Sequence, residues 1–360
     1  MSKHDDAHIP ASAPPAIGLH TRSLSRRAVQ YLLLLALLLI LLLASLIIGS
    51  VYISPRDLWA VFSGEGGDLL SQKIVWQLRL PRSIVAVLGS AALATAGLLM
   101  QTLFRNPLAG PSVLGLSAGS SLAVAMYTMG GIGLSLGAPG IMGTSISAML
   151  GSLAVLLLIM AVARRFSDIT SVLIVGLMFG FFTSAVVSLL QSTASESAIK
   201  TFVFWGFGSF SKVMNGELLF FGLPLLVAML AAALLIKPLD ALLLGERHAE
   251  TVGVDTGRLR LHIVLITGIL TGVVTAFCGP IAFIGLAAPH IARLLSGSVK
   301  HSLVMPLAWL SAAILGLLCD IIARWPFSES SIPLNAVCAM FGAPLVIYLI
   351  FAGRRKKWLI

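Results

Sequence analysis

Charged residues are scarce in this chain: Asp, Glu, Lys and Arg together make up 11% of its 360 residues. Soluble globular proteins carry about 25% charged residues, so this low fraction argues against a water-soluble enzyme or binding module. Hydrophobic residues make up 58% of the chain, and the mean hydropathy is +1.00. This composition is typical of a protein that crosses the lipid bilayer several times.

Motifs for covalent or metal chemistry are missing as well. No lysine follows a glycine, so the chain lacks the GxxxxGK[ST] phosphate-binding loop and is not expected to hydrolyse ATP by itself. Its three cysteines lie in apolar stretches, which favours buried reduced thiols over a disulfide framework. The seven histidines are scattered without the paired spacing of zinc sites. We therefore expect no catalytic residue, no metal and no cofactor in this chain.

The positive charges do not form one patch that would bind nucleic acid, although the net charge is +10. Lys and Arg instead punctuate the apolar segments, which indicates a membrane topology with positive loops inside. A charged side chain at the centre of a membrane helix costs about 2.5–3.5 kcal/mol, so charges should mark the ends of spans. The segments between charges predict ten spans, at residues 29–50, 83–104, 111–128, 141–163, 169–192, 217–236, 261–279, 281–296, 302–323 and 332–352.

The first span and the two tails complete this topology. Residues 31–49 carry no charge and exceed the apolar core of a signal peptide, about 7–15 residues, so we expect an uncleaved span. An even number of spans leaves both ends on one side, and the excess of Lys and Arg there predicts that both termini are cytoplasmic. Residues 1–28 are expected to form a disordered cytoplasmic tail, residues 29–353 the membrane domain and residues 354–360 a basic cytoplasmic tail.

The stretch QTLFRNPLAGPSVLG, residues 101–115, interrupts the apolar text with helix-breaking residues. Asn106, Pro107, Gly110 and Pro111 are typical of a tight turn, and we expect them to shape the reversal between the second and third spans. A structural role is favoured over contact with a ligand, because Pro and Gly at a reversal normally serve the turn.

Two similar motifs indicate an internal repeat. GPSVLGLSAG at residues 110–119 and GPIAFIGLAAP at residues 279–289 share Gly-Pro, a few small or apolar residues, and Gly-Leu. In the predicted topology they lie on opposite sides of the membrane. This pattern is typical of the inverted repeats from which transport proteins build alternating access, although Gly-rich apolar text can also match by chance.

One polar segment, KPLDALLLGERHAETVGVDTGRLR at residues 237–260, is too long for a simple turn. It predicts two short cytoplasmic helices at residues 239–244 and 246–252, with breaks at Gly245 and Gly253. A docking surface for a soluble partner and a solvated loop that merely links two spans both fit this pattern.

Five stretches, in this order, resemble the FecCD-type permeases of ATP-binding-cassette (ABC) importers. They are RLPRSIVAVLGSAALATAGLLMQTLFRNPLAGPSVLG (79–115), LLGERHAETVGV (243–254), GPIAFIGLAAPHIAR (279–293), DIIAR (320–324) and GAPLVIYLI (342–350). The resemblance covers residues 50–353, and it leaves the N-terminal tail outside.

The resemblance implies an all-α polytopic membrane protein with the type II importer permease fold, about ten transmembrane helices and an inverted repeat. Such a permease lies in the bacterial inner membrane, pairs with a second copy or a homologue, and binds two cytoplasmic ATPase subunits that hold ATP and Mg. A periplasmic binding protein delivers the cargo. The cargo implied is an iron-siderophore complex, haem or cobalamin, and the residues do not choose among these.

The resemblance also assigns roles to single residues. It implies that residues 243–254 form the coupling helices, with Gly245, Glu246, Ala249 and Gly253 at the ATPase. It implies that Arg79, Arg82 and Arg324 receive acidic residues of the binding protein.

Simpler roles fit the same arginines. Arg79 and Arg82 could snorkel at the start of a span, and Arg324 could pair with Asp320 one helical turn away.

Three further features stay open at this point. By resemblance in position, Thr170 and Ser171 are expected at a cytoplasmic gate. The aromatic segment FVFWGFGSF, residues 202–210, fits an interfacial anchor, with contact to the cargo as the alternative. A proton-coupled secondary transporter is the rival function, and Asp320 and Glu217 are the carboxylates it could use. Both lie near predicted span ends, which argues against a proton relay.

Overall fold

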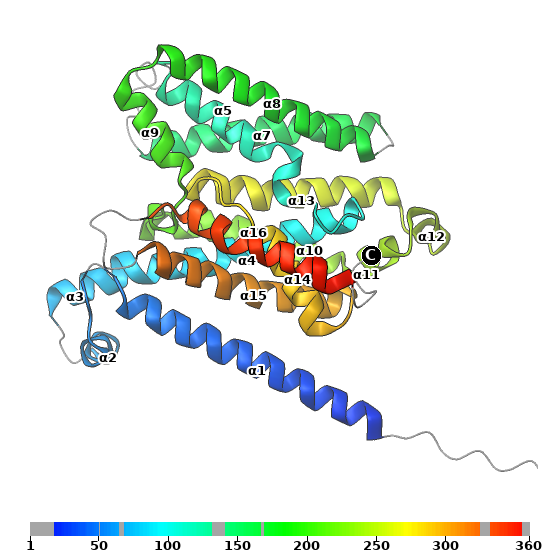
Figure 1. Ribbon diagram of the computed structural model, residues 1–360, viewed down its shortest axis with the longest axis horizontal. Coiled ribbons are helices and arrows are strands. Elements are labelled where there is room, and N and C mark those ends of the chain that lie inside the picture. Colours follow the sequence, from blue (N-terminus) through cyan, green and yellow to red (C-terminus); the bar gives the residue numbers. More distant parts are fainter. Residues whose placement is uncertain are drawn as a thin grey trace, which may run out of the picture.

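The structure is a computed structural model that describes residues 18–49, 51–64, 68–131, 141–166, 169–324 and 332–354. Within these ranges every regular element is a helix (Figure 1). The predicted all-α membrane fold is therefore confirmed. Residues 1–17 and 355–360, which hold most of the two predicted tails, lie outside the described residues.

Each of the ten predicted spans corresponds to one helix among the described residues. These helices are α1 (Gly18–Ile47), α4 (Leu80–Leu103), α5 (Leu116–Thr128), α7 (Ile141–Arg165), α8 (Ile169–Thr193), α10 (Leu218–Leu234), α13 (Thr256–Cys278), α14 (Ile284–Ser296), α15 (His301–Ala323) and α16 (Leu334–Arg354). Seven segments of the described chain are long and apolar enough to cross a membrane on their own. Helices α5 and α14 are shorter, with 13 residues each.

Some boundaries differ from the predicted ones. Helix α1 begins at Gly18, so residues 18–28 are helical and not part of a disordered tail. The segment SLSRRAVQ is rich in good helix formers, which lets the helix continue beyond the apolar run. Helix α13 begins at Thr256 because Asp255 caps it, accepting a hydrogen bond from the Arg258 amide at 2.9 Å.

Shorter helices lie at the two ends of the bundle. Helices α2 (Pro55–Ser63), α3 (Leu69–Lys73) and α9 (Glu196–Gly206) lie at one end, and α11 (Ile236–Leu243) and α12 (Glu246–Thr251) lie at the other (Figure 1). Helix α1 begins, and α16 ends, at the α11–α12 end. We call this the inner end, and the end with α2, α3 and α9 the outer end.

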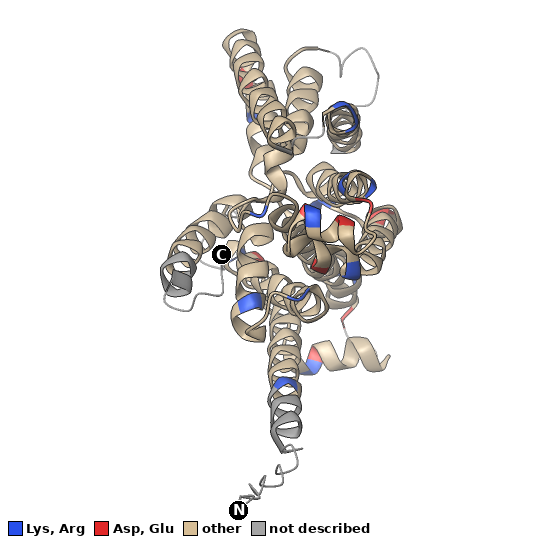
Figure 2. Ribbon diagram, turned by 90° about the vertical axis from the view of Figure 1, so that its right-hand side faces the viewer, with Lys and Arg blue, Asp and Glu red and all other residues tan. Residues whose placement is uncertain are grey.

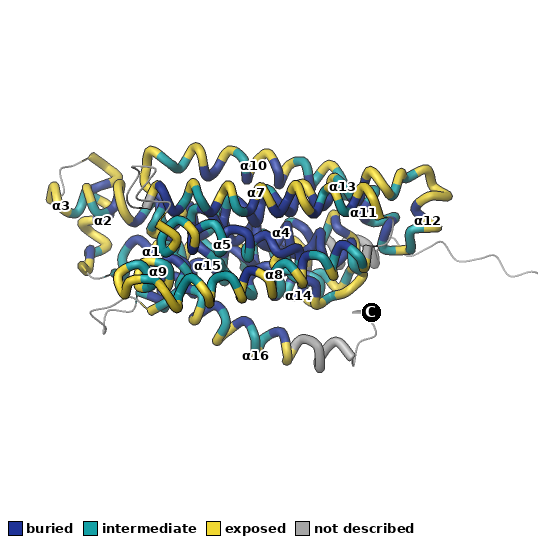
Figure 3. The backbone as a smooth tube through the Cα atoms, turned by 90° about the horizontal axis from the view of Figure 1, so that it is seen from above, coloured by how far each residue is buried: buried dark blue, intermediate teal, exposed yellow. Residues whose placement is uncertain are grey.

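Helix α4 forms the centre of the packing, and nearly all of its residues from Gly89 to Leu103 are buried (Figure 3). Its sequence GSAALATAG consists mainly of small residues, which lets neighbouring backbones approach closely. The closest approach is to α14, where a Cβ atom added at Gly97 would lie 1.7 Å from the carbonyl oxygen of Gly285.

The packing is repeated in the two halves of the chain. In the first half, α5 packs against α7 and α8, and in the second half α14 packs in the same way against α15 and α16. The halves also contact each other in matching pairs: α4 packs against α15, and α13 packs against α7. The two Gly-Pro motifs open α5 and α14, and each contains a residue with positive φ just before the helix, Gly115 (73°) and Phe283 (65°). Gly115 lies against Gly176 of α8, and Phe283 lies against Gly342 of α16. The repeat read from the sequence thus has a structural counterpart.

The Gly97–Gly285 contact generates a prediction on stability. Gly97→Ala should lower the free energy of unfolding by about 1–3 kcal/mol, because the added methyl group forces α4 and α14 apart. Thermal unfolding of the purified protein in detergent measures the effect. Gly180→Ala in α8 is the control, since no atom lies within 4 Å of the added Cβ. Equal unfolding temperatures for the two variants would contradict the close contact.

Candidate functional site

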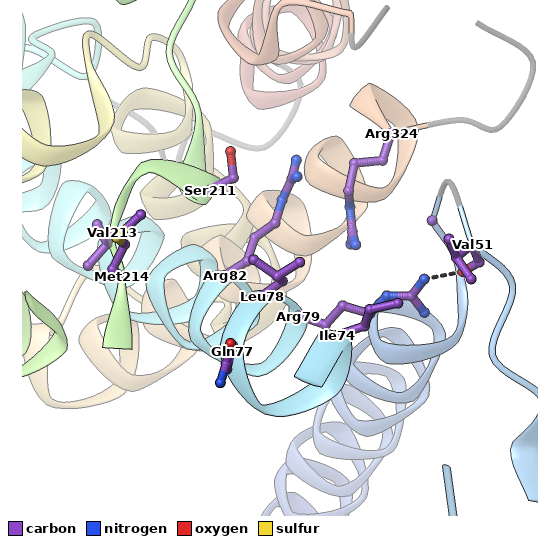
Figure 4. A pocket seen from close by; sticks show the side chains of 11 residues that line it. Val51, Ile74, Gln77, Leu78, Arg79, Arg82, Ser211, Val213, Met214 and Arg324 are labelled. Atoms are coloured by element: carbon purple, nitrogen blue, oxygen red, sulfur yellow. Dashed lines mark hydrogen bonds between the residues drawn. The ribbon is translucent and has the colours of Figure 1, made fainter. Parts of the chain in front are cut away.

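Three arginines gather at the outer end of the bundle. A π-helical segment, Ile74–Arg79, joins α3 to α4 without a break, so Arg79 and Arg82 extend from one continuous helix. Arg324 is the C-cap of α15. Figure 4 shows Arg82 and Arg324 extending toward the same space, while Arg79 turns toward Val51.

Asp320 of α15 is the counter-charge of this cluster, and it is fully buried. Its carboxylate accepts hydrogen bonds from Nε of Arg82 at 2.8 Å and forms an ion pair with Nη2 of Arg82, also at 2.8 Å. Nη2 of Arg324 pairs with the same carboxylate at 3.0 Å. The expected pair between Asp320 and Arg324 is thus confirmed. The pairing with Arg82, from a helix far away in the sequence, was not expected.

Arg79 and Arg324 also close the C-terminal end of α1. Arg79 donates to the carbonyl oxygen of Ile47 at 2.8 Å and to those of Leu46 and Val51. Arg324 donates to the carbonyl oxygen of Ser45 at 3.2 Å and to its Oγ at 2.8 Å. Cations are favourable at a helix C-terminus because the helix dipole is negative there. Arg79 and Arg324 therefore have structural partners within the chain.

The cluster keeps surplus positive charge beside a cavity. The cluster has three guanidinium groups and one carboxylate, Asp320, which pairs with Arg82 and Arg324. A cavity of about 350 Å³ is lined by all three arginines. Burial lowers the pKa of Arg324 to about 10, against the opposing effect of Asp320, which leaves this group charged at neutral pH. The Arg82 side chain is the more exposed of the two that bind Asp320, at 18% against 9% for Arg324. This arrangement can accept a further carboxylate from outside the chain.

The polar segment at the inner end forms the two short helices expected there, α11 and α12. Gly245 and Gly253, which separate them from their neighbours, have positive φ values of 120° and 85°, a conformation that favours glycine. Glu246 lies 3.4 Å from Nη2 of Arg260 in α13. Ala249 is buried within the chain itself.

The exposed residues around α12 include two large apolar side chains. Leu244, which precedes α12 in the sequence, is 71% exposed, and Val252, which follows it, is 59% exposed. Figure 2 views the molecule from this end, where the ribbon positions of several basic and acidic residues lie near one another. Apolar anchors inside a polar rim are typical of a protein–protein contact.

Polar residues connect this segment to the core, through a half-buried Asp240 and the buried His301 and Thr102. Asp240 of α11 accepts hydrogen bonds from the amide and Nδ1 of His301, at 2.8 and 2.7 Å. Nε2 of His301 lies 2.8 Å from Oγ1 of Thr102 in α4. Burial raises the pKa of Asp240, but the hydrogen bonds and charge of His301 outweigh this effect and hold the pKa below its ordinary value.

A second link joins α4 to α14, where Arg293 donates to Oε1 of Gln101 at 2.6 Å. The sequence reading missed both links. For the link of His301 to Asp240, the sequence offered only a weak signal: a histidine and an acidic residue next to predicted span ends, with no fixed spacing between them.

The remaining candidates lie apart from these clusters. Thr170 and Ser171 lie in the first turn of α8. Asn106 forms a turn in which its Oδ1 accepts from the Leu108 amide at 2.9 Å, and Pro111 begins a 3-10 helix, Pro111–Leu114. Pro107 and Gly110 lie between them, in the connection from α4 to α5. Trp205 is buried beside Val124, Ala148 and Ala276, so it is not an exposed interfacial anchor.

The carboxylates that a proton relay would use are engaged elsewhere. Asp320 is held by two arginines, and Glu217 accepts a hydrogen bond from the Met214 amide at 3.1 Å in the 3-10 helix Asn215–Glu217. In the described part of the chain, no group of three or more His, Cys, Asp and Glu side chains could hold a metal ion.

Comparisons with known proteins agree on one family. The FecCD transport family pattern matches residues 37–352. The vitamin B12 import system permease proteins BtuC of Salmonella typhi and of Salmonella enteritidis are each 34% identical over 337 residues, which cover 93% of this chain and 98% of the relative. Among solved structures, a transporter described as of the metal-chelate ABC type, in an inward-facing conformation, superimposes with a TM-score of 0.78. That chain is 31% identical, and the match covers 89% of this chain and 97% of that one.

The Asp320 cluster generates a prediction on stability. Asp320→Ala should reduce the free energy of unfolding by about 3–5 kcal/mol, because it leaves two largely buried guanidinium groups without their carboxylate. Thermal unfolding in detergent measures this loss. Arg258→Ala is the control, since that side chain is 81% exposed in its pair with Asp255 and should contribute at most about 1 kcal/mol. An Asp320→Ala protein as stable as the control would overturn the structural role of the cluster.

Proposed function

This chain belongs to the FecCD transport family and is the permease subunit of an ABC importer, and from that premise we propose that it passes an iron-siderophore complex, haem or cobalamin from a periplasmic binding protein to the cytoplasm. It is the non-catalytic, multi-pass membrane component of a bacterial importer. ATP and Mg belong to the separate ATPase subunits in this proposal. Membership of this family argues against the alternative function, a proton-coupled secondary transporter.

Two surfaces with different chemistry, at opposite ends of one helical bundle, support this function most directly. The outer end carries the arginine cavity, with its surplus positive charge. The inner end carries α12, a short polar helix with an exposed apolar residue shortly before it and directly after it in the sequence. A permease that takes cargo from a binding protein at one end and binds an ATPase at the other needs two such separate surfaces.

At the inner end, we propose that α11 and α12 bind the ATPase as the coupling segment, residues 237–260. Leu244 and Val252 are suited to an apolar groove, and Glu246 is held toward Arg260 of α13. Gly245 and Gly253 supply the turns, and the buried Ala249 fixes α12 against its own chain. Movement of this segment reaches α4 and α15 through Asp240, His301 and Thr102.

At the outer end, we propose that Arg82 and Arg324, supported by Arg79, receive acidic side chains of the binding protein. Arg82 combines the ion pair to Asp320 with the larger exposed fraction, so one guanidinium edge can bind inside the chain while another faces outward. Arginine suits this role because its planar fork binds carboxylates through two hydrogen bonds.

The topology proposed is that of the bacterial inner membrane with both termini in the cytoplasm. Helix α1 begins and α16 ends at the inner end, where several Lys and Arg positions lie along the ribbon (Figure 2). The positive-inside rule then assigns this end to the cytoplasm. A second permease subunit, identical or homologous, completes the proposed pathway. Thr170 and Ser171 lie in the first turn of α8, at the inner end, and this position suits the cytoplasmic gate proposed for them.

Changing the apolar anchors of α12 tests the coupling segment. Val252→Asp should abolish co-purification with the ATPase, because it puts a charge into the proposed apolar contact, while the unfolding temperature stays near that of the wild type. Pull-down from detergent and ATPase activity in nanodiscs measure this.

Val299→Asp is the matched control, since Val299 is also exposed, at 44%, in the connection between α14 and α15. If both variants retain the ATPase, the coupling role of α12 is wrong.

The outer surface is tested through binding of the cognate periplasmic protein. Arg82→Gln should weaken that binding about tenfold, the effect of one charge-assisted hydrogen bond, and should reduce its dependence on salt. Surface plasmon resonance with the permease in nanodiscs measures both. Arg56→Gln in α2 changes another exposed arginine at the same end and should leave the affinity unchanged. Equal affinities for wild type and Arg82→Gln at low salt would contradict the docking role.

A further inference from the structure

A second cavity at the outer end is larger than the arginine cavity and separate from it. It has a volume of about 530 Å³ and lies where the end of α5, the start of α7, one face of α9 and the 3-10 helix Phe210–Lys212 meet. Volumes of about 300–1,000 Å³ are typical of small-molecule sites. Neither proposed docking surface uses this cavity.

The charge on its lining is positive. Lys200 and Lys212 are the charged residues among those that line it, and no acidic side chain of the described chain does so. Nζ of Lys212 donates to the carbonyl oxygen of Trp205 at 3.2 Å, and no carboxylate of the described residues forms an ion pair with it. Burial lowers the pKa of Lys212 to about 8. A partly buried cation of this kind is stabilised by an anion that enters the cavity.

The rest of the lining combines aromatic rings with hydroxyl groups. Phe204 is 57% exposed and has Nζ of Lys200 at 6.0 Å from its ring centroid, while Trp205 forms a buried wall. Ser197 and Thr201 lie on the same face of α9 as Lys200 and Phe204, one helical turn apart. Ammonium groups and hydroxyls suit an oxygen-rich anion, and the rings suit a flat conjugated body.

We propose that this cavity binds an anionic, ring-bearing ferric chelate of the catecholate class on the outer side of the permease. The inference rests on the proposed import function and narrows its cargo. Two lysines and several hydroxyls match a chelate with several negative oxygens better than a phospholipid headgroup with a single phosphodiester charge. A corrin whose rim carries neutral amides would gain little from two ammonium groups.

The test uses the permease–ATPase complex in phosphatidylcholine nanodiscs, which contain no anionic lipid. The probe is the iron(III) complex of 2,3-dihydroxybenzoate, which is anionic and aromatic, and cationic ferrioxamine B is the comparison. Retention of iron-55 in filtration measures binding. The anionic chelate should bind at least about tenfold more tightly than ferrioxamine B, since each hydrogen bond to a charged group contributes about that factor.

Variants then assign the binding to this cavity. Lys200→Gln combined with Lys212→Gln should remove the preference for the anionic chelate, and Phe204→Leu should weaken its binding several-fold. Lys73→Gln in α3, another exposed lysine at the outer end, is the matched control and should bind like the wild type. Equal binding by the double variant and the wild type overturns the proposal, as does equal binding of the two chelates. Loss of binding when phosphatidylglycerol is added would identify a lipid headgroup site and would also overturn it.

ATPase activity of the same complexes separates this inference from the function on which it rests. A complex that assembles and responds to its binding protein, yet shows no preference for the anionic chelate, refutes the chelate site alone. A permease that binds no ATPase refutes the importer assignment itself.

Discussion

The ion pairs of Asp320 are the interaction on which the outer half of the molecule depends. A buried carboxylate is tolerated only when it is paired and hydrogen-bonded, and Asp320 achieves this through Arg82 of α4 and Arg324 at the end of α15. Arg324 then reaches the last turn of α1 through Ser45. One carboxylate therefore fixes three helices and holds two arginines next to the cavity at this end of the bundle. The groups that stabilise this end of the bundle also line the cavity there.

Helices α4 and α15 connect the two ends of the permease. Near the outer end they carry Arg82 and Asp320. At the inner end they carry Thr102 and His301, and His301 contacts Asp240 of α11. A displacement of α11 thus acts on the same two helices that hold the arginines. The close contact of Gly97 with Gly285 adds α14 to this unit. Because packed helices shift as rigid bodies, a movement at either end would reach the other through α4 and α15.

The sequence predicted the membrane fold and the ten helical segments, since hydropathy and charge report directly on what lipid permits. The family followed from the resemblance of five motif stretches, not from hydropathy. It also predicted the breaks at Gly245 and Gly253 and the pair of Asp320 with Arg324, because these depend on local backbone geometry and one helical turn. It misjudged the start of α1, where helix propensity extends the helix beyond the apolar run. Local signals were sufficient where the interaction is local.

Contacts between residues far apart in the chain were decided only by the tertiary structure. Arg82 meets Asp320 across 238 positions and Thr102 meets His301 across 199, so no spacing rule could join them. The cavity with Lys200 and Lys212 is likewise formed by four separate segments. The sequence by itself determined which segments enter the membrane and where they end, since the bilayer penalises each misplaced charge individually. Which charges become partners depends on how the helices pack, and packing is a property of the whole chain.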